Sequence, residues 1–166
     1  MLHKMLSKLD SRVPFDQAQA HCDVPCGIYD PITAQIAALT VVRMVDIIEE
    51  LEKTHPEKDL AYFNTLSRAI AVKEEHAEKV KAEVRIIWGD YFKAAHIEKY
   101  PEIHGLVHEI QQLGSKARQT IDREASIKLL EKVNRFAEIF WDTKGKATKR
   151  AEAPYKPSLE LVYPVL

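Results

Sequence analysis

Apolar residues recur three and four positions apart over four long stretches of this chain, which predicts four helices that each bury at least one side. The connections between these stretches are short, and such connections place neighbouring helices antiparallel. We therefore predict an all-α fold, an antiparallel up-down four-helix bundle. The helices are expected at residues 32–53, 59 to 88 or 91, 101–118 and 121–140.

The first of these helices is apolar on two sides. Ile32, Ile36 and Leu39 share one side, whereas Met44 and Ile48 lie nearly opposite. One face cannot bury both groups, so this helix is either central in its own bundle or shared with another subunit.

Length and charge limit the kinds of protein this can be. With 166 residues, 46% of them hydrophobic, the chain suits one compact domain. Its net charge of −1 gives no reason to expect nucleic acid or an anionic membrane as a partner. Charged residues interrupt positions 1–20, so this segment is no secretory signal, and no later stretch resembles a membrane span. We expect a cytoplasmic protein without a membrane partner.

The end of the chain differs in composition from the four predicted helices. A basic stretch at 144–150 would favourably meet the negative end of the fourth helix. Residues 151–166 contain Pro154, Pro157 and Pro164 and cannot be helical along their length. We expect an extended tail that docks on its own bundle, docks on a neighbouring subunit, or frays.

Both cysteines of the chain lie close together near its N-terminal end, as Cys22 and Cys26, with His21 directly before the first. In a reducing compartment this pair favours metal binding or redox chemistry, although a disulfide loop stays open as an alternative. If the chain were cut after Ala20, the freed amine of His21, the amide nitrogen and thiolate of Cys22, and the thiolate of Cys26 would offer two nitrogens and two sulfurs. A planar set of this kind suits Ni(II) or Cu(II), whereas Zn(II) prefers a tetrahedron.

The segment HCDVPCGIYDP, residues 21–31, resembles the nickel hook of the nickel superoxide dismutases almost letter for letter. The resemblance continues at residues 88–93, 96–102 and 140–144, and covers essentially all of 21–144. It implies an oxidoreductase with one nickel ion per subunit, assembled as a hexamer of four-helix bundles. Residues 1–20 would be a propeptide that a dedicated protease removes, 21–150 the bundle with its N-terminal metal-binding hook at 21–31, and 151–166 the tail.

The same resemblance implies roles for residues of the hook. Nickel would be held by the amine and imidazole of His21, the amide nitrogen and thiolate of Cys22, and the thiolate of Cys26. Tyr29 would stand beside the open face of the metal and limit access to it. Asp23 would brace the hook through hydrogen bonds.

Two further hook residues and one departure from the family pattern follow from the alignment. Pro25 would supply a cis peptide bond and Gly27 backbone freedom after the second thiolate. Some family members hold the axial imidazole with a glutamate, whose position aligns here with Ala37. Arg68 is the substitute partner that we consider for His21.

The reaction implied is disproportionation of superoxide to dioxygen and hydrogen peroxide, with nickel alternating between Ni(II) and Ni(III). Two other functions are compatible with the sequence. One is a non-catalytic nickel or copper carrier that uses the same ligands. The other is a helical interaction module in which Cys22 and Cys26 are incidental.

The remaining candidates favour ordinary structural roles. His104 and His108 lie four apart on one predicted helix, but no second pair of ligands supports a metal site there. His76 is expected to be solvated, and Lys73 to be a snorkelling side chain or an interface ion pair rather than a catalytic base. Aromatic residues are expected in the core or at subunit contacts, with one of them possible at the mouth of the site: Trp88, Tyr91, Phe92 and Trp141.

Overall fold

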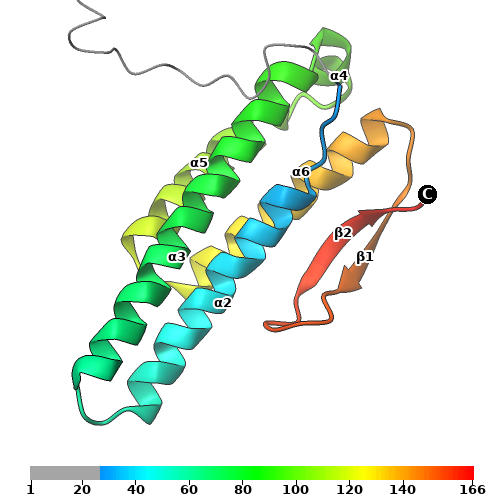
Figure 1. Ribbon diagram of the computed structural model, residues 1–166. Helices are drawn as coiled ribbons and strands as arrows, with labels where there is room; N and C mark the ends of the chain where they lie inside the picture. The colour runs from blue at the N-terminus through cyan, green and yellow to red at the C-terminus, as the bar shows by residue number, and fades with distance from the viewer. Residues whose placement is uncertain (1–26) are drawn as a thin grey trace, which may run out of the picture.

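Four long helices form a bundle in the computed structural model, which describes residues 27–166 (Figure 1). Both α3 and α6 pack against α2, and both also pack against α5, so the four helices close into a ring. The predicted bundle is confirmed. Its helices are α2 (Ile32–Thr54), α3 (Leu60–Ile86), α5 (Ile103–Gln119) and α6 (Arg123–Thr143).

Aspartates begin two of these helices. The Asp59 carboxylate accepts a hydrogen bond of 2.8 Å from the amide of Tyr62 at the start of α3. The Asp122 carboxylate accepts one of 2.9 Å from the amide of Ala125 at the start of α6. Each bond satisfies an amide that has no partner within its own helix, which is why these helices begin where they do.

The end of α3 departs from a regular helix. A π-helical turn, η1 (Ile87–Tyr91), follows it, and a short helix, α4 (Ala94–Lys99), lies between η1 and α5. The sequence analysis did not predict α4. Lys99 and Tyr100 at its end both donate hydrogen bonds to the Asp142 carboxylate near the end of α6. Both bonds lower the pKa of Asp142, and the bond from Lys99 has the larger effect. They also tie the end of α4 to α6.

Lys73 of α3 is fully buried and does not reach solvent. Its ammonium donates to the carbonyl oxygens of Arg118 at 2.9 Å and Thr120 at 3.0 Å, and also to that of Ala117. The predicted interface ion pair or snorkelling side chain is therefore wrong. The charge caps the C-terminal end of α5, where carbonyl groups lack helical partners.

The C-terminal tail forms a β-hairpin on the side of the bundle. β1 (Thr148–Glu152) pairs antiparallel with β2 (Glu160–Pro164), with Arg150 opposite Val162. The hairpin packs against α6 and α2 (Figure 1). Of the three expectations for the tail, docking on its own bundle is confirmed, and β1 begins before the expected boundary at residue 150.

Within residues 27–166, no helix is long and apolar enough to cross a membrane.

Candidate metal centre

The predicted metal ligands lie just before the part of the chain that the structure describes. His21, Cys22, Asp23 and Cys26 all fall outside residues 27–166. The description begins at Gly27, whose φ of +70° is a conformation that favours glycine, as the resemblance implies. The described part of the candidate site consists of the residues that follow the predicted ligands in sequence.

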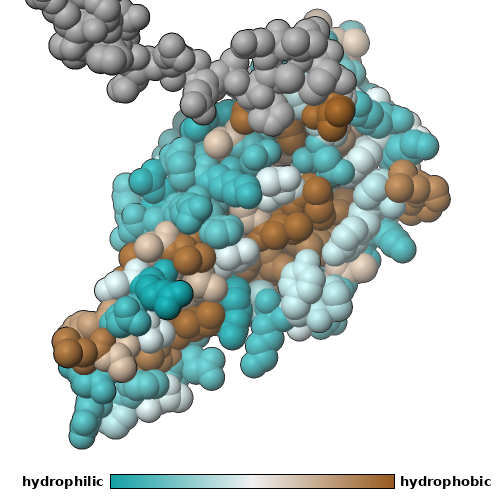
Figure 2. Space-filling model, in the orientation of Figure 1, coloured by the Kyte–Doolittle hydropathy of each residue, from teal (hydrophilic) through white to brown (hydrophobic). Residues whose placement is uncertain are grey.

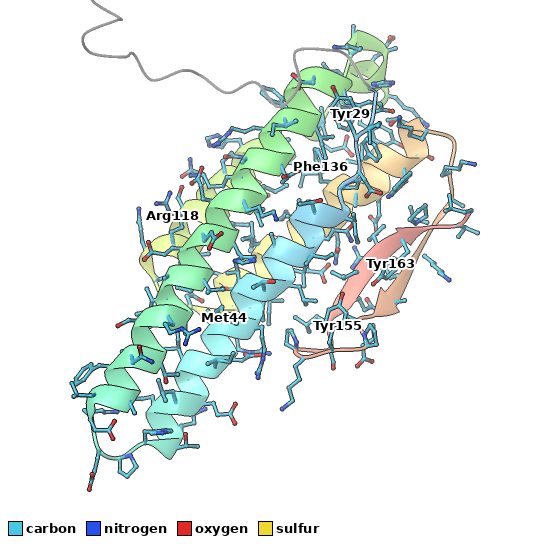
Figure 3. The ribbon with its side chains drawn as sticks, in the orientation of Figure 1. Tyr29, Met44, Arg118, Phe136, Tyr155 and Tyr163 are labelled. Atoms are coloured by element: carbon cyan, nitrogen blue, oxygen red, sulfur yellow. The ribbon has the colours of Figure 1, made fainter. Side chains whose placement is uncertain are left out.

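Tyr29 anchors the chain to the bundle directly before α2. The Asp30 carboxylate accepts a 2.8 Å hydrogen bond from the amide of Ile32 and so fixes the first turn of α2. Tyr29 is half-buried and packs against the hydrophobic core beside the end of α3 (Figure 3). A cavity of about 230 Å³ opens there, lined by Ile28, Tyr29, Asp30, Thr33, Glu83, Ile86 and Ile87.

Tyr91 supports Tyr29 from the π-helical turn. The two ring centroids lie 6.0 Å apart. On its other sides the Tyr91 ring stacks on His96 at 5.1 Å and packs on Phe140 of α6 at 4.8 Å. Aromatic pairs at such distances stabilise one another beyond the area that they bury. Tyr91 thus links α6 and α4 to the residue next to the predicted ligands.

The hydroxyl and the outer face of Tyr91 are also held. Its hydroxyl lies 2.8 Å from the Thr143 hydroxyl, which donates to the carbonyl oxygen of Phe140 at 2.6 Å. The Lys144 ammonium lies 4.7 Å from the centre of the Tyr91 ring, within the range of a cation–π contact. An exposed positive charge therefore stands at this end of the bundle.

Two residues bear on the support of His21: Ala37, at the position of the glutamate of some family members, and Arg68, the possible substitute partner. Ala37 is fully buried in the core. Arg68 is exposed and lines a groove with Met44, about 18 Å along α2 from its first residue. The structure therefore does not bring Arg68 to Tyr29, and no observation supports it as a partner of His21.

The other histidine candidates keep structural roles. His104 Nδ1 accepts a 3.1 Å hydrogen bond from the Trp88 indole, and the two rings meet edge to face. His76 is half-buried, with its Nδ1 2.9 Å from the carbonyl oxygen of Val72. From residue 27 onward, no group of three or more His, Cys, Asp or Glu side chains could hold a metal ion.

The chemistry of the donors fits nickel. Two thiolates and an imidazole are soft and borderline ligands of the kind that Ni(II) and Cu(II) accept, and His21, Cys22 and Cys26 supply them within six consecutive residues.

Sequence reasoning did not single out Tyr91 as a residue of the site. It grouped Tyr91 with three other aromatic residues as core or contact side chains, and allowed that one of them might reach the mouth of the site. The π-helical turn that carries Tyr91 toward Tyr29 has no simple sequence signature. The segment 88–93 was noted only through its resemblance to the family.

Comparison with known proteins identifies the family. Residues 16–144 match the sequence model of the nickel-containing superoxide dismutases. Two Streptomyces proteins named superoxide dismutase [Ni] match over 140 residues, which is 84% of this chain and 98% of theirs. The protein of Streptomyces coelicolor is 38% identical and that of Streptomyces seoulensis 36%.

Solved structures agree with the sequence relatives. A native nickel superoxide dismutase is 39% identical with a TM-score of 0.62, and it covers 75% of this chain and 99% of its own. A structure described as having nickel ligation of the oxidised state is 38% identical with the same TM-score and the same coverage. The family match extends over more than half of the chain, and it includes the cysteine pair, Tyr29 and Tyr91. The chain therefore belongs to the nickel-containing superoxide dismutase family.

Proposed function

We propose that this protein is a superoxide dismutase that converts two superoxide anions and two protons into dioxygen and hydrogen peroxide. The nickel ion, one per subunit, would be held by His21, Cys22 and Cys26. Bound there, nickel would supply one-electron redox chemistry, accepting an electron from one superoxide and returning it to another. The observation that carries the proposal is that residues 16–144, the cysteine pair included, match the nickel superoxide dismutase family.

The chain's own task is to admit a small anion and to supply protons. Tyr29 lines a cavity of about 230 Å³ and is backed by the Tyr91 ring at 6.0 Å. A tyrosine held in this way limits the size of what reaches the metal, and its hydroxyl is our candidate for proton delivery. The exposed Lys144 ammonium adds a positive charge that favours the approach of an anion. Asp23 is proposed to brace the ligand segment.

Residues 1–20 are proposed to be a leader that a protease removes before nickel binds. With a peptide bond in place of the His21 amine, the first nitrogen ligand is lost, because an amide nitrogen binds metal far less readily than an amine. We therefore expect the uncut chain to hold nickel poorly. The trimmed bundle would then begin at His21 and run to residue 150, followed by the tail.

We further propose a homo-oligomer, with a hexamer as the expected state, in the cytoplasm. Apolar side chains gather along α2 on the face that Figure 2 shows. Ile36 of α2 is 46% exposed and Phe63 of α3 is 51% exposed. Exposed apolar groups of this kind support association between copies of the chain. A reducing compartment would keep Cys22 and Cys26 as thiols.

The proposal is tested by following superoxide decay after pulse radiolysis in the presence of nickel-loaded protein that begins at His21. We expect decay far faster than in buffer, and loss of both nickel and activity in Cys22→Ser and Cys26→Ser. A protein that binds nickel through both cysteines without accelerating the decay would be a carrier, and the proposal would fail. Unchanged activity in both variants would leave the cysteines incidental.

A further inference from the structure

The C-terminal hairpin is an addition to the family's bundle. It begins at Thr148, whereas the match to the family ends at residue 144. The native relative of known structure covers only 75% of this chain although 99% of its own length is matched. The hairpin therefore lies outside the region that matches the family. Its contacts with the bundle indicate what it does.

The hairpin is packed into the bundle as tightly as a core element. Leu161 and Val162 of β2 are 0% and 1% exposed, and Ala153 after β1 is also buried. Leu161 and Ala153 belong to the same hydrophobic cluster as the core of the four helices. Full burial of a leucine and a valine removes their apolar surface from water and so stabilises the docked hairpin.

Two buried amides lock the hairpin backbone to both α2 and α6. Gln35 of α2 donates from Nε2 to the carbonyl oxygen of Val162 at 3.1 Å and to Asn134 Oδ1 at 3.1 Å. Asn134 of α6 donates from Nδ2 to the carbonyl oxygen of Glu160 at 2.8 Å. The side chains of Gln35 and Asn134 are both 0% exposed. Water therefore cannot take the place of the carbonyl oxygens of Val162 and Glu160 unless the structure opens.

Ion pairs near the surface hold the hairpin to α6. Arg150 of β1 contacts Glu138 at 2.9 Å and Glu131 at 2.8 Å, and both glutamates belong to α6. The bond from Gln35 to the carbonyl oxygen of Val162 links the hairpin to α2. This bond is made at the first turn of α2.

Gln35 lies one helical turn from the start of α2 and is close in sequence to Tyr29. Its own amide donates to the carbonyl oxygen of Pro31 at 3.0 Å, which is the first helical bond of α2. Pro31 is two residues from Tyr29. The side-chain bonds of Gln35 are therefore made one helical turn after Pro31, close to Tyr29 in the chain.

We propose that the β1–β2 hairpin is a brace that holds the first turn of α2 against α6, and thereby positions Tyr29, which follows the proposed nickel ligands in sequence. Gln35 and Asn134 are positioning residues in this arrangement, since neither is placed at the metal. The part of the inference that concerns nickel rests on the proposed function. The part that concerns the first turn of α2 stands on the contacts alone.

The test compares two brace variants with a core control in the full-length chain. Gln35→Leu removes both side-chain bonds at similar volume, and Leu161→Ala loosens the hairpin. Ile110→Ala is the control, because Ile110 is as fully buried as Leu161 but lies in α5, which packs mainly on α3 and α6. Hydrogen exchange is measured at the amides of Gln35 and Ile36 in metal-free protein, at a temperature where every variant is folded.

We expect both brace variants to speed exchange at these two amides about tenfold beyond any change in the α5 core, and the control to show no such selectivity. Release of nickel to a chelator from the trimmed, loaded protein should also quicken several-fold in the brace variants only. Exchange that changes evenly across the bundle would overturn the brace. Selective exchange with unchanged nickel release would overturn the link to the metal. Wild-type protein that binds no nickel would instead count against the proposed function, and exchange would still decide the brace.

Discussion

Lys73 places a positive charge inside the bundle, and the end of α5 makes this possible. Three carbonyl oxygens surround its ammonium, and the negative end of the helix dipole points toward it. Burial lowers the pKa of Lys73, which shows that the fold disfavours its charge compared with water. Its hydrogen bonds to the three carbonyl oxygens offset this cost.

Lys73→Met is expected to lower the free energy of unfolding by about 2–3 kcal/mol, because it leaves these carbonyl groups without a donor at nearly constant volume. Urea denaturation measures the change. Lys79→Met, at an exposed position of the same helix, is the control and should stay within about 0.5 kcal/mol of the wild type. Equal stabilities of the two variants would contradict the capping role.

Tyr91 allows its ring and its hydroxyl to be tested separately. Tyr91→Phe loses the bond to Thr143 but keeps the ring against Tyr29, so we expect a loss of about 1 kcal/mol in stability and little change in superoxide turnover. Tyr91→Ala also removes the support of Tyr29, and turnover should fall about tenfold or more. Pulse radiolysis of the two nickel-loaded variants measures the difference. Full activity in the alanine variant would separate Tyr91 from the site.

Among the helices, α6 is capped at its start by a residue, Asp122, whose contribution to stability depends on pH. The amide of Ala125 and then the Lys116 ammonium lower the pKa of Asp122 below its ordinary value of 3.8. The stabilising contribution of this carboxylate is therefore complete above about pH 5, well above the unfolded value, and is lost as pH falls through the lowered pKa of the folded state.

Asp122→Asn keeps a capping oxygen but removes the charge. We expect its stability to fall less steeply than that of the wild type between about pH 5 and pH 3, because one carboxylate no longer binds a proton on unfolding. Urea unfolding at a series of pH values provides the two curves. Parallel curves throughout this range would show that the charge of Asp122 makes no contribution.

Helices and strands differed in how well they could be predicted. The four long helices have regular apolar spacing, and aspartates such as Asp59 mark where they begin, so each starts within two residues of its predicted position. The hairpin was not predicted because β1 is mostly polar and its pairing depends on a binding surface made by Gln35 and Asn134. Those two amides are 99 residues apart in sequence, and nothing local indicates that they meet.

The candidate site was predictable only in part for a related reason. The cysteine pair and Tyr29 are close together in the sequence, so the segment could be recognised at once. Tyr91 reaches Tyr29 through a π-helical turn, and Lys144 comes from the far end of α6. Such contacts depend on how the helices are packed, which the pattern of residues does not specify.

For the whole molecule, the apolar surface of α2 and α3 predicts association. Ile36→Glu and Phe63→Glu place a charge on exposed apolar positions, so they should leave the subunit folded while shifting it to smaller species in sedimentation velocity. The wild type is expected as a hexamer. Lys149→Glu, an exposed position of β1, is the control for the added negative charge. A wild type that sediments as a monomer would contradict the proposed assembly.

The most direct test of the account is electron paramagnetic resonance combined with metal analysis, on protein that begins at His21 and on the uncut chain. We predict one nickel per trimmed chain and a rhombic Ni(III) signal split by a nitrogen ligand, with little nickel in the uncut chain. Nickel bound equally well with residues 1–20 in place, or a signal without nitrogen splitting, would contradict the ligand set of His21, Cys22 and Cys26.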